Sequence, residues 1–287
     1  MQADLSGVPR HSLLHTAGNV VWVARNERAQ LAPLIASYAR LKARELVEHR
    51  GPPRGVRHTR ILGMDVAFLD HYWLVEMFEE IFLRRQYSFE SAKEQPLIVD
   101  VGSNIGLSIL FFKRLFPAAA IIGFEPDPAA FALLRRNVDE NRLRHVSLLN
   151  MAVYDGADSV QLYGDPTTPG SPQHSTRRGR VGGTSQEVPA TRLSEHLAGP
   201  VDYLKLDVEG AERVVIEELA RSGKLDLVER MAIEYHHHVE AEEDSLGDLL
   251  ATLERNGFGY QLEARFGPGA AAARGRFQNV LVYGYRK

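Results

Sequence analysis

The chain has 287 residues, of which 44% are hydrophobic, enough for one large domain or one domain with an extension. Lysine and arginine number 34 against 37 aspartate and glutamate, a net charge of −3, which disfavours nucleic acid as a partner. The absence of cysteine excludes disulfides and cysteine-bound zinc, and no apolar run approaches the ~20 residues that span a bilayer. The first residues lack a basic segment followed by an apolar one, so we expect a cytoplasmic protein without a membrane partner.

The first part of the chain, residues 1–95, is predicted to be a helical extension rather than an independent domain. Apolar residues recur with helical spacing over 27–49, and glycines and prolines at 51–55 break that pattern. Residues 61–69 favour a short strand or a hairpin around Gly63, and Asp70 is positioned to cap a following helix. The helix at 27–49 would serve either dimerisation of two copies or packing on its own domain.

From Pro96 onward, short apolar runs alternate with helical patterns, which predicts an α/β domain over 96–287. Such alternation is typical of a mostly parallel sheet covered on both faces. The last two strands, 258–265 and 277–285, have no helix between them and are expected to pair antiparallel. The predicted strands are 97–101, 120–124, 146–150, 201–206 and 229–235, and the helices are 105–115, 128–141, 210–221 and 243–256. Residues 164–186 are poor in apolar residues and form either a solvated loop or a substrate lid.

A glycine turn follows the first strand of this domain. The strand ends in Asp100, and Gly102 and Gly106 bracket a turn that lets the backbone approach a nucleotide-like ligand. A second acid, Glu125, ends the next strand near the offset at which an acid meets a ribose. A dinucleotide fingerprint requires glycine where this chain has Asn104, so the pattern suits a phosphate-free ligand such as S-adenosylmethionine. The alternative is a glycine turn that binds no ligand.

Two further groups of polar residues follow buried strands. Asp207 ends the strand at 201–206 and is expected beside the Gly102 turn, whereas Glu212 is interpreted as an ordinary acid at a helix start. The strand at 229–235 ends in Glu234, Tyr235 and three histidines, of which His236 is the candidate general base and His237 and His238 are expected to be solvated. Together with His236, a set of carboxylates would also suit a hard divalent ion such as Mg²⁺; these candidate metal ligands are Asp207, Glu209 and Glu234.

Taken together, these segments resemble the FkbM family of S-adenosylmethionine-dependent methyltransferases over about residues 60–287. Four motifs in this order carry the resemblance: Ile98 to Ser108, Gly123 to Pro128, Leu204 to Glu212, and Ile233 to His236. The resemblance implies a Rossmann-like class I methyltransferase fold with seven strands. It also implies donor-binding residues: Asp100, Gly102, Ser103, Asn104 and Gly106 for the methionine end, Glu125 for the ribose, Asn150 and Ala152 for the adenine, and Asp207 for the sulfonium end or a metal.

The function that the resemblance implies is O-methylation of a hydroxyl on a sugar, a glycoside or another small natural product. In this hypothesis His236 is the base, and Glu234 or Asp207 orients it or binds a metal that acidifies the hydroxyl. Two alternatives remain open: an NAD(P)-dependent oxidoreductase, which the altered glycine pattern disfavours, and a non-catalytic binding protein on the same fold.

Overall fold

The computed structural model describes residues 31–47, 55–165, 170–181, 183–237, 239, 245–264 and 278–287. The described residues form two compact units, which divide after Ser88, whereas the sequence placed the boundary after Gln95. The predicted helix at 27–49 and the predicted strand at 277–285 each extend partly outside the described residues. None of the helices in the described ranges is long and apolar enough to span a membrane.

The described part of the N-terminal unit combines helices with a β-hairpin. Its elements are α2 (Leu31–Val47), β1 (Arg57–Ile61), β2 (Met64–Phe68), α3 (His71–Phe78) and a π-helical turn η2 (Glu79–Leu83). β1 and β2 pair antiparallel around Gly63, which is the hairpin of the two alternatives that the sequence left open, although β1 begins at Arg57, before the predicted range 61–69. Asp70 caps α3 by accepting hydrogen bonds from the backbone N–H groups of Tyr72 and Trp73 at 2.7 and 3.3 Å. The buried Tyr38 hydroxyl of α2 donates to Glu79 at 2.7 Å, so a helix-helix contact includes a polar link.

The second unit is built on a seven-stranded sheet with the strand order β11-β12-β10-β9-β3-β4-β5. The five strands that form its parallel part are β3 (Leu97–Val101), β4 (Ala120–Phe124), β5 (Val146–Leu149), β9 (Tyr203–Leu206) and β10 (Arg230–His237). β12 (Gln278–Arg286) lies antiparallel between β10 and β11 (Phe258–Ala264). The predicted seven-stranded, mostly parallel sheet with an antiparallel C-terminal pair is therefore confirmed.

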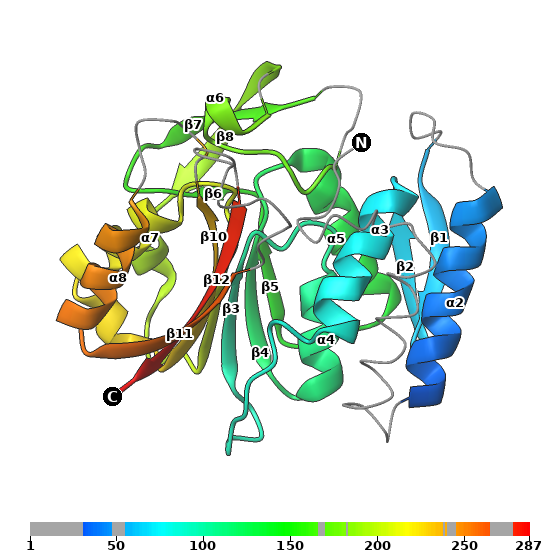
Figure 1. Ribbon diagram of the computed structural model, residues 1–287, viewed down its shortest axis with the longest axis horizontal. Coiled ribbons are helices and arrows are strands. Elements are labelled where there is room, and N and C mark those ends of the chain that lie inside the picture. Colours follow the sequence, from blue (N-terminus) through cyan, green and yellow to red (C-terminus); the bar gives the residue numbers. More distant parts are fainter. Residues whose placement is uncertain are drawn as a thin grey trace. The chain divides into compact units, whose positions relative to one another are not determined.

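Helices cover both faces of this sheet. Figure 1 shows α4 (Leu107–Leu115) and α5 (Pro128–Glu140) on one side of the strands, and α7 (Glu212–Arg221) and α8 (Leu246–Arg255) on the other. Two short 3-10 helices, η3 (Leu193–His196) and η4 (Lys224–Leu227), flank β9 in the chain. The central strands are covered on both faces, which is why they are short, continuous apolar runs: Val99, Leu204 and Ile233 are at most 1% exposed. A charged residue within such a strand, as at Asp100 and Lys205, is therefore forced into the interior.

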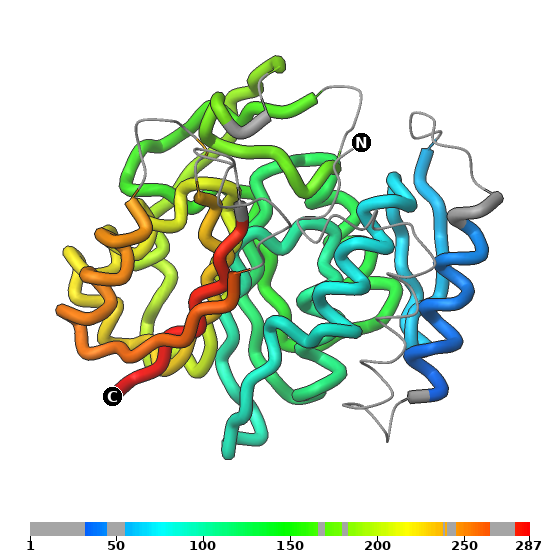
Figure 2. The backbone as a smooth tube through the Cα atoms, in the orientation of Figure 1, coloured from blue at the N-terminus to red at the C-terminus, as the bar shows by residue number. Residues whose placement is uncertain are grey.

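A second, three-stranded sheet lies beyond the carboxyl ends of the parallel strands. It has the order β6-β8-β7 and comprises β6 (Ala152–Val153), β7 (Ser159–Gly164) and β8 (Thr184–Thr191), with the one-turn helix α6 (Arg178–Val181) between β7 and β8. The tube in Figure 2 follows this green segment above the main sheet. The described part of 164–186 thus includes strand and helix residues. Ser171 and Ser175 are only 6% and 0% exposed, which a solvated loop does not explain, whereas residues 183–186 are exposed.

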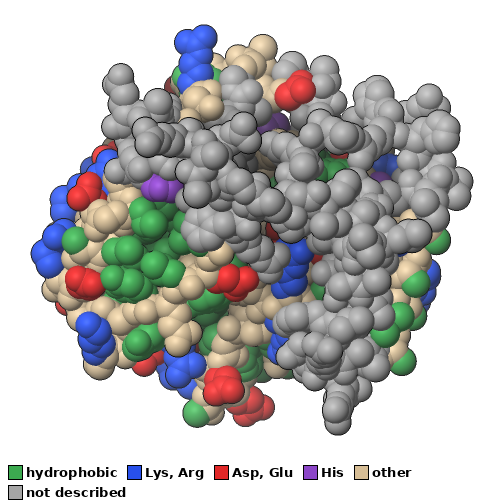
Figure 3. All heavy atoms as spheres, viewed as in Figure 1, with side chains coloured by type: hydrophobic (Ala, Val, Ile, Leu, Met, Phe, Trp, Pro, Cys, Tyr) green, Lys and Arg blue, Asp and Glu red, His purple; other side chains and the backbone are tan. Residues whose placement is uncertain are grey.

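The surface of the described residues carries charges of both signs. In the view of Figure 3, acidic and basic side chains are interspersed with hydrophobic and neutral ones. Two large hydrophobic side chains of the antiparallel C-terminal strands are exposed, Leu262 of β11 at 48% and Tyr285 of β12 at 44%.

Candidate functional site

The direction of the chain crossovers reverses between β3 and β9, because β4 and β5 lie on one side of β3 while β9 and β10 lie on the other. In open α/β sheets, ligands bind outside the carboxyl ends of the strands at such a reversal. The residues that follow β3, β4, β9 and β10 are therefore the first place to seek a functional site.

The Gly102 turn passes directly against the end of β9. Gly102 has φ +83°, and a Cβ at this position would lie 1.8 Å from the carbonyl oxygen of Asp207. The N–H groups of Gly102 and Ser103 donate to the Phe124 carbonyl at 3.0 and 2.9 Å, which fixes the turn to β4. The predicted meeting of Asp207 with the Gly102 turn is present, and it permits only glycine at position 102.

A network of buried charged side chains contacts this turn. Asp100 is fully buried; its Oδ2 accepts from the Ser108 hydroxyl at 2.5 Å, and its Oδ1 lies 3.4 Å from Nζ of Lys205. Lys205 also lies 3.4 Å from Oδ2 of Asp207 and donates to the Gly102 carbonyl at 2.5 Å. Burial alone would lower the pKa of Lys205, but the charges of Asp100, Asp207 and Glu234 outweigh it and raise that pKa. Asp100 is thus fixed to Ser108 and Lys205 beneath the turn.

Glu125, at the end of β4, accepts hydrogen bonds from two backbone N–H groups at the carboxyl ends of the parallel strands. Its Oε2 accepts the backbone N–H of Asn104 at 2.8 Å, and its Oε1 accepts that of Asp127 at 2.9 Å. Burial raises the pKa of Glu125 to about 7, and the charge of Asp127 adds to this, while the two backbone donors oppose it. Nδ2 of Asn150 donates to the Glu125 carbonyl at 2.8 Å, and Ala152 is buried in β6. The residues expected to hold a ribose and an adenine therefore lie along the ends of β4 and β5.

Polar contacts connect the segment at 170–177 to residues at the carboxyl ends of the parallel strands. Asp127 accepts the backbone N–H of Gly170 at 3.0 Å, and its Oδ2 lies 3.1 Å from Nδ1 of His174. The Ser175 hydroxyl donates to the Glu209 carbonyl at 2.5 Å. These contacts place the inserted segment over the carboxyl ends of β4 and β9, the position expected of a substrate lid; residues 166–169 and 182 lie outside the described residues.

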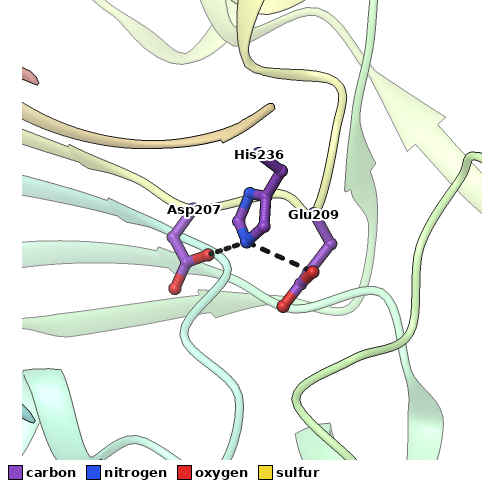
Figure 4. A group of neighbouring side chains, drawn as sticks. All are labelled: Asp207, Glu209 and His236. Atoms are coloured by element: carbon purple, nitrogen blue, oxygen red, sulfur yellow. Dashed lines mark ion pairs between the residues drawn. The ribbon is translucent and has the colours of Figure 1, made fainter. Parts of the chain in front are cut away.

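A histidine and two carboxylates converge where β9 and β10 end (Figure 4). Nε2 of His236 lies 3.2 Å from Oε2 of Glu209 and 3.9 Å from Oδ1 of Asp207. One donor atom from each of the three residues lies within 4.8 Å of the others. We call Asp207, Glu209 and His236 the edge cluster. Glu209 has φ +54°, a backbone conformation that residues other than glycine rarely adopt. With this backbone conformation in the turn after β9, the Glu209 carboxylate lies beside the imidazole.

Glu212, the first residue of α7, holds the other side of the imidazole. Its Oε1 lies 2.8 Å from Nδ1 of His236 and accepts the backbone N–H of Gly210 at 2.9 Å. Glu212 is 1% exposed. The interpretation of Glu212 as an ordinary helix-start acid was incomplete, because the side chain both accepts at the helix start and fixes the histidine. Lys205 was not singled out at all; the signal was a lone charge within an apolar strand.

Electrostatics around the edge cluster favour a positive charge at the imidazole. Burial alone would lower the pKa of His236, but the carboxylates of Glu209 and Glu212 raise it well above its usual value. Burial raises the pKa of Asp207, which the charges of Lys205 and His236 partly offset. The carboxylates therefore stabilise a cation at Nε2, whether that cation is a proton or a bound ion.

Glu234 lies apart from the edge cluster. Its Oε1 accepts from Nδ2 of Asn279 on β12 at 2.5 Å, and its charge contributes to the raised pKa of Lys205. The proposed catalytic and metal-binding roles of Glu234 therefore stay predictions, as do the donor-binding roles of Asn104, Gly106, Asn150 and Ala152.

A small, open pocket of about 20 Å³, room for about one water molecule, lies beside His236. Its lining includes two arginines, Arg177 and Arg213, together with Tyr235 and His236. Nη1 of Arg213 also pairs with Oε1 of Glu217 at 2.7 Å, one turn away on α7. The lining is chemically complementary to acidic or hydroxyl groups of a ligand.

Comparison with known proteins gives a consistent result. The sequence matches the model of a family described as the methyltransferase FkbM domain over residues 100–260. The methyltransferase sdnD of Sordaria araneosa is 32% identical over 173 residues, covering 49% of this chain and 67% of that protein. Methyltransferase 1 of Beauveria bassiana is 28% identical, covering 64% and 81%. The 31-O-demethyl-FK506 methyltransferase FkbM of Streptomyces tacrolimicus is 27% identical, covering 75% and 90%.

Proposed function

Because this chain belongs to the family of FkbM methyltransferases, we propose that it transfers a methyl group from S-adenosylmethionine to a hydroxyl of a sugar, a glycoside or another small natural product. The observation that carries the proposal is the meeting of the Gly102 turn with Asp207 at the reversal point of the sheet, next to the imidazole of His236. A donor site thus lies next to a cluster of titratable side chains, the edge cluster.

The residues at this edge suit a phosphate-free adenosyl donor. The missing Cβ at Gly102 lets this turn pack directly against the backbone of Asp207, and Ser103, Asn104 and Gly106 continue the same turn. Glu125 provides a carboxylate for ribose hydroxyls, and Asn150 and Ala152 follow the strand at which the adenine is expected. The carboxylate of Asp207 favours a positively charged ligand such as a sulfonium. When bound, the donor supplies an electrophilic methyl group.

Proton removal from the acceptor falls to the edge cluster in this proposal. An acceptor hydroxyl must be aligned with the methyl group and must lose its proton during or after transfer. His236 lies in the wall of the pocket, and Glu209 lies 3.2 Å from its Nε2, so an acceptor group that enters there lies next to the edge cluster. Arg177 and Arg213 are placed to hold polar or acidic groups of the acceptor away from the reacting oxygen.

The preference for oxygen as the methylated atom draws on one relative. The FkbM protein of Streptomyces tacrolimicus, which this chain matches over 90% of its length, is named as acting on 31-O-demethyl-FK506. The shared family and the imidazole–carboxylate group, which suits a hydroxyl acceptor, support an O-methyltransferase over an enzyme that methylates carbon.

The test is methyl transfer from S-adenosyl-[methyl-¹⁴C]methionine to panels of monosaccharides, glycosides and hydroxylated polyketides. We expect label in at least one hydroxyl-bearing acceptor, released as a methyl ether, and no label when that hydroxyl is already methylated. Label on a carbon or nitrogen atom would contradict the O-methyl assignment. A protein that binds S-adenosylhomocysteine yet labels no acceptor in the panels would favour the non-catalytic alternative.

A further inference from the structure

The edge cluster has the donor set and spacing of a metal site. Two carboxylate oxygens and one imidazole nitrogen, from Asp207, Glu209 and His236, lie within 4.8 Å of one another, with separations of 3.2 and 3.9 Å from Nε2. Ligand atoms that each lie about 2.0–2.2 Å from one ion are separated by roughly 3–4 Å. Only small side-chain rotations would bring all three donor atoms onto a common ion.

The histidine is oriented in the way that a metal ligand requires. Nδ1 of His236 lies 2.8 Å from Oε1 of Glu212, and both side chains are at most 4% exposed. A metal-bound histidine commonly donates its second ring N–H to a carboxylate, which fixes the tautomer and turns the other nitrogen toward the ion. Glu212 is itself fixed by the backbone N–H of Gly210 at 2.9 Å, so Nε2 is held facing Asp207 and Glu209.

The charges around the imidazole also favour a dication. The carboxylates of Asp207, Glu209 and Glu212 all lie within 3.9 Å of its ring nitrogens. A proton at Nε2 brings one positive charge to these three carboxylates, whereas a divalent ion brings two and contacts two of the carboxylates directly. The partly buried position makes close charge compensation valuable, because the carboxylates have lost much of their hydration.

We propose that Asp207, Glu209 and His236 bind one divalent first-row transition-metal ion, such as Mn²⁺, Fe²⁺ or Zn²⁺. The sequence suggested a hard ion such as Mg²⁺ for a group that includes His236, but a coordinating imidazole nitrogen favours the later metals, since Mg²⁺ prefers oxygen ligands. Glu234, a candidate ligand from the sequence, is not among these three residues. Binding of the ion is independent of the methyl-transfer reaction; its role, to polarise the acceptor hydroxyl beside the pocket, rests on the proposed function.

The test uses the full chain, stripped with a chelator and titrated with Co²⁺, which reports its own coordination through visible absorption. We expect one Co²⁺ per chain, with visible bands more intense than those of the hydrated ion, and displacement of Co²⁺ by Zn²⁺. Glu209→Gln and Asp207→Asn should each weaken Co²⁺ binding at least about tenfold. The matched control is Asp155→Asn, an exposed carboxylate in a turn, which should bind Co²⁺ like the unaltered chain.

Two results would overturn the proposal: a chain that binds no stoichiometric Co²⁺, and Glu209→Gln and Asp207→Asn variants that keep the affinity of the Asp155→Asn control. Titration of the stripped chain with S-adenosylhomocysteine separates this failure from failure of the proposed function. Binding of S-adenosylhomocysteine without Co²⁺ binding removes only the metal site. A chain that binds Co²⁺ but not S-adenosylhomocysteine would contradict the methyl-donor assignment and would still support the metal site.

Discussion

Nδ1 of His236 lies 2.8 Å from Oε1 of Glu212, and this pair joins the end of β10 to the start of α7 in the interior of the protein. The contact fixes which face of the imidazole points at Asp207 and Glu209. Glu212 thus acts through His236 as a positioning residue, and the arrangement of the edge cluster depends on it.

Glu212→Gln tests this positioning. The substitution keeps the volume and one oxygen but removes the charge that holds the imidazole, so we expect kcat and Co²⁺ affinity to fall about 10- to 100-fold. The dissociation constant for S-adenosylhomocysteine should stay unchanged, because Glu212 does not belong to the donor-binding turn. Glu254→Gln, on the exposed side of α8, is the control and should alter neither quantity. Equal losses in donor and Co²⁺ binding would indicate a general structural role instead.

The Gly102 turn gives a prediction about stability. Gly102→Ala would place a Cβ 1.8 Å from the Asp207 carbonyl oxygen and would also be strained at φ +83°. Gly223→Ala is a matched control, because Gly223 has φ +71° but no atom within 4 Å of the added Cβ. We expect the control to cost about 1 kcal/mol of unfolding free energy and Gly102→Ala to cost at least about 2 kcal/mol more. Urea unfolding measures the unfolding free energy of both variants. Equal losses would mean that the Cβ added at position 102 does not clash with the end of β9.

Lys205 gives a prediction that depends on pH. Lys205→Met leaves the buried carboxylates of Asp100 and Asp207 without the ammonium that lies 3.4 Å from each, and we expect a loss of about 3–5 kcal/mol near neutral pH. The loss should shrink as the pH falls, because a protonated carboxyl no longer needs the cation, and the pKa of Asp207 is already raised by burial. Lys93→Met, which removes an exposed lysine paired with Asp202 at 2.7 Å, should cost under about 1 kcal/mol at any pH. Chemical unfolding at several pH values distinguishes the two.

Glu125 gives the opposite pH dependence. Its pKa in the folded state is about 7, raised by burial from a usual value of 4.5, so the folded state holds this proton more tightly than the unfolded state. Its stabilising contribution is complete below pH 4.5 and is lost as the pH rises through 7, a change of about 3 kcal/mol. Glu125→Gln does not titrate, so its unfolding free energy relative to the unaltered chain should rise by that amount over this window. Glu187→Gln, at an exposed carboxylate, should show no such trend; a flat difference for Glu125→Gln would refute the raised pKa.

The sequence was informative where one residue type suffices to define a local structure. Apolar runs ending in Asp100, Glu125 and Asp207 predicted the strands and the edge at which these acids lie, because parallel strands bring their carboxyl ends together. Glycines at 102 and 106 predicted the turn, because glycine readily adopts the positive φ that a tight turn needs. The roles of Glu212 and Lys205 were missed because each depends on a partner far away in the chain: His236 lies 24 positions from Glu212, and the Gly102 carbonyl 103 positions from Lys205.

The sequence also could not show which of the two glutamates, Glu234 or Glu209, lies beside the imidazole of His236. Alternation along β10 correctly suggested that Glu234 and His236 share a strand face, yet Glu234 pairs with Asn279 of β12, a strand whose register the sequence does not reveal. Glu209 reaches the imidazole only because its backbone takes up φ +54°, a turn geometry that no side-chain pattern announces.

The central claim is that the edge formed by the Gly102 turn, Glu125 and Asp207 binds an adenosyl donor without phosphates. Isothermal titration of the full chain with S-adenosylhomocysteine, with NADH as the competing ligand, tests it most directly. The account predicts one S-adenosylhomocysteine per chain, weaker binding by Glu125→Gln, and no heat of binding with NADH. The absence of a heat of binding at saturating S-adenosylhomocysteine, or binding of NADH instead, would contradict it.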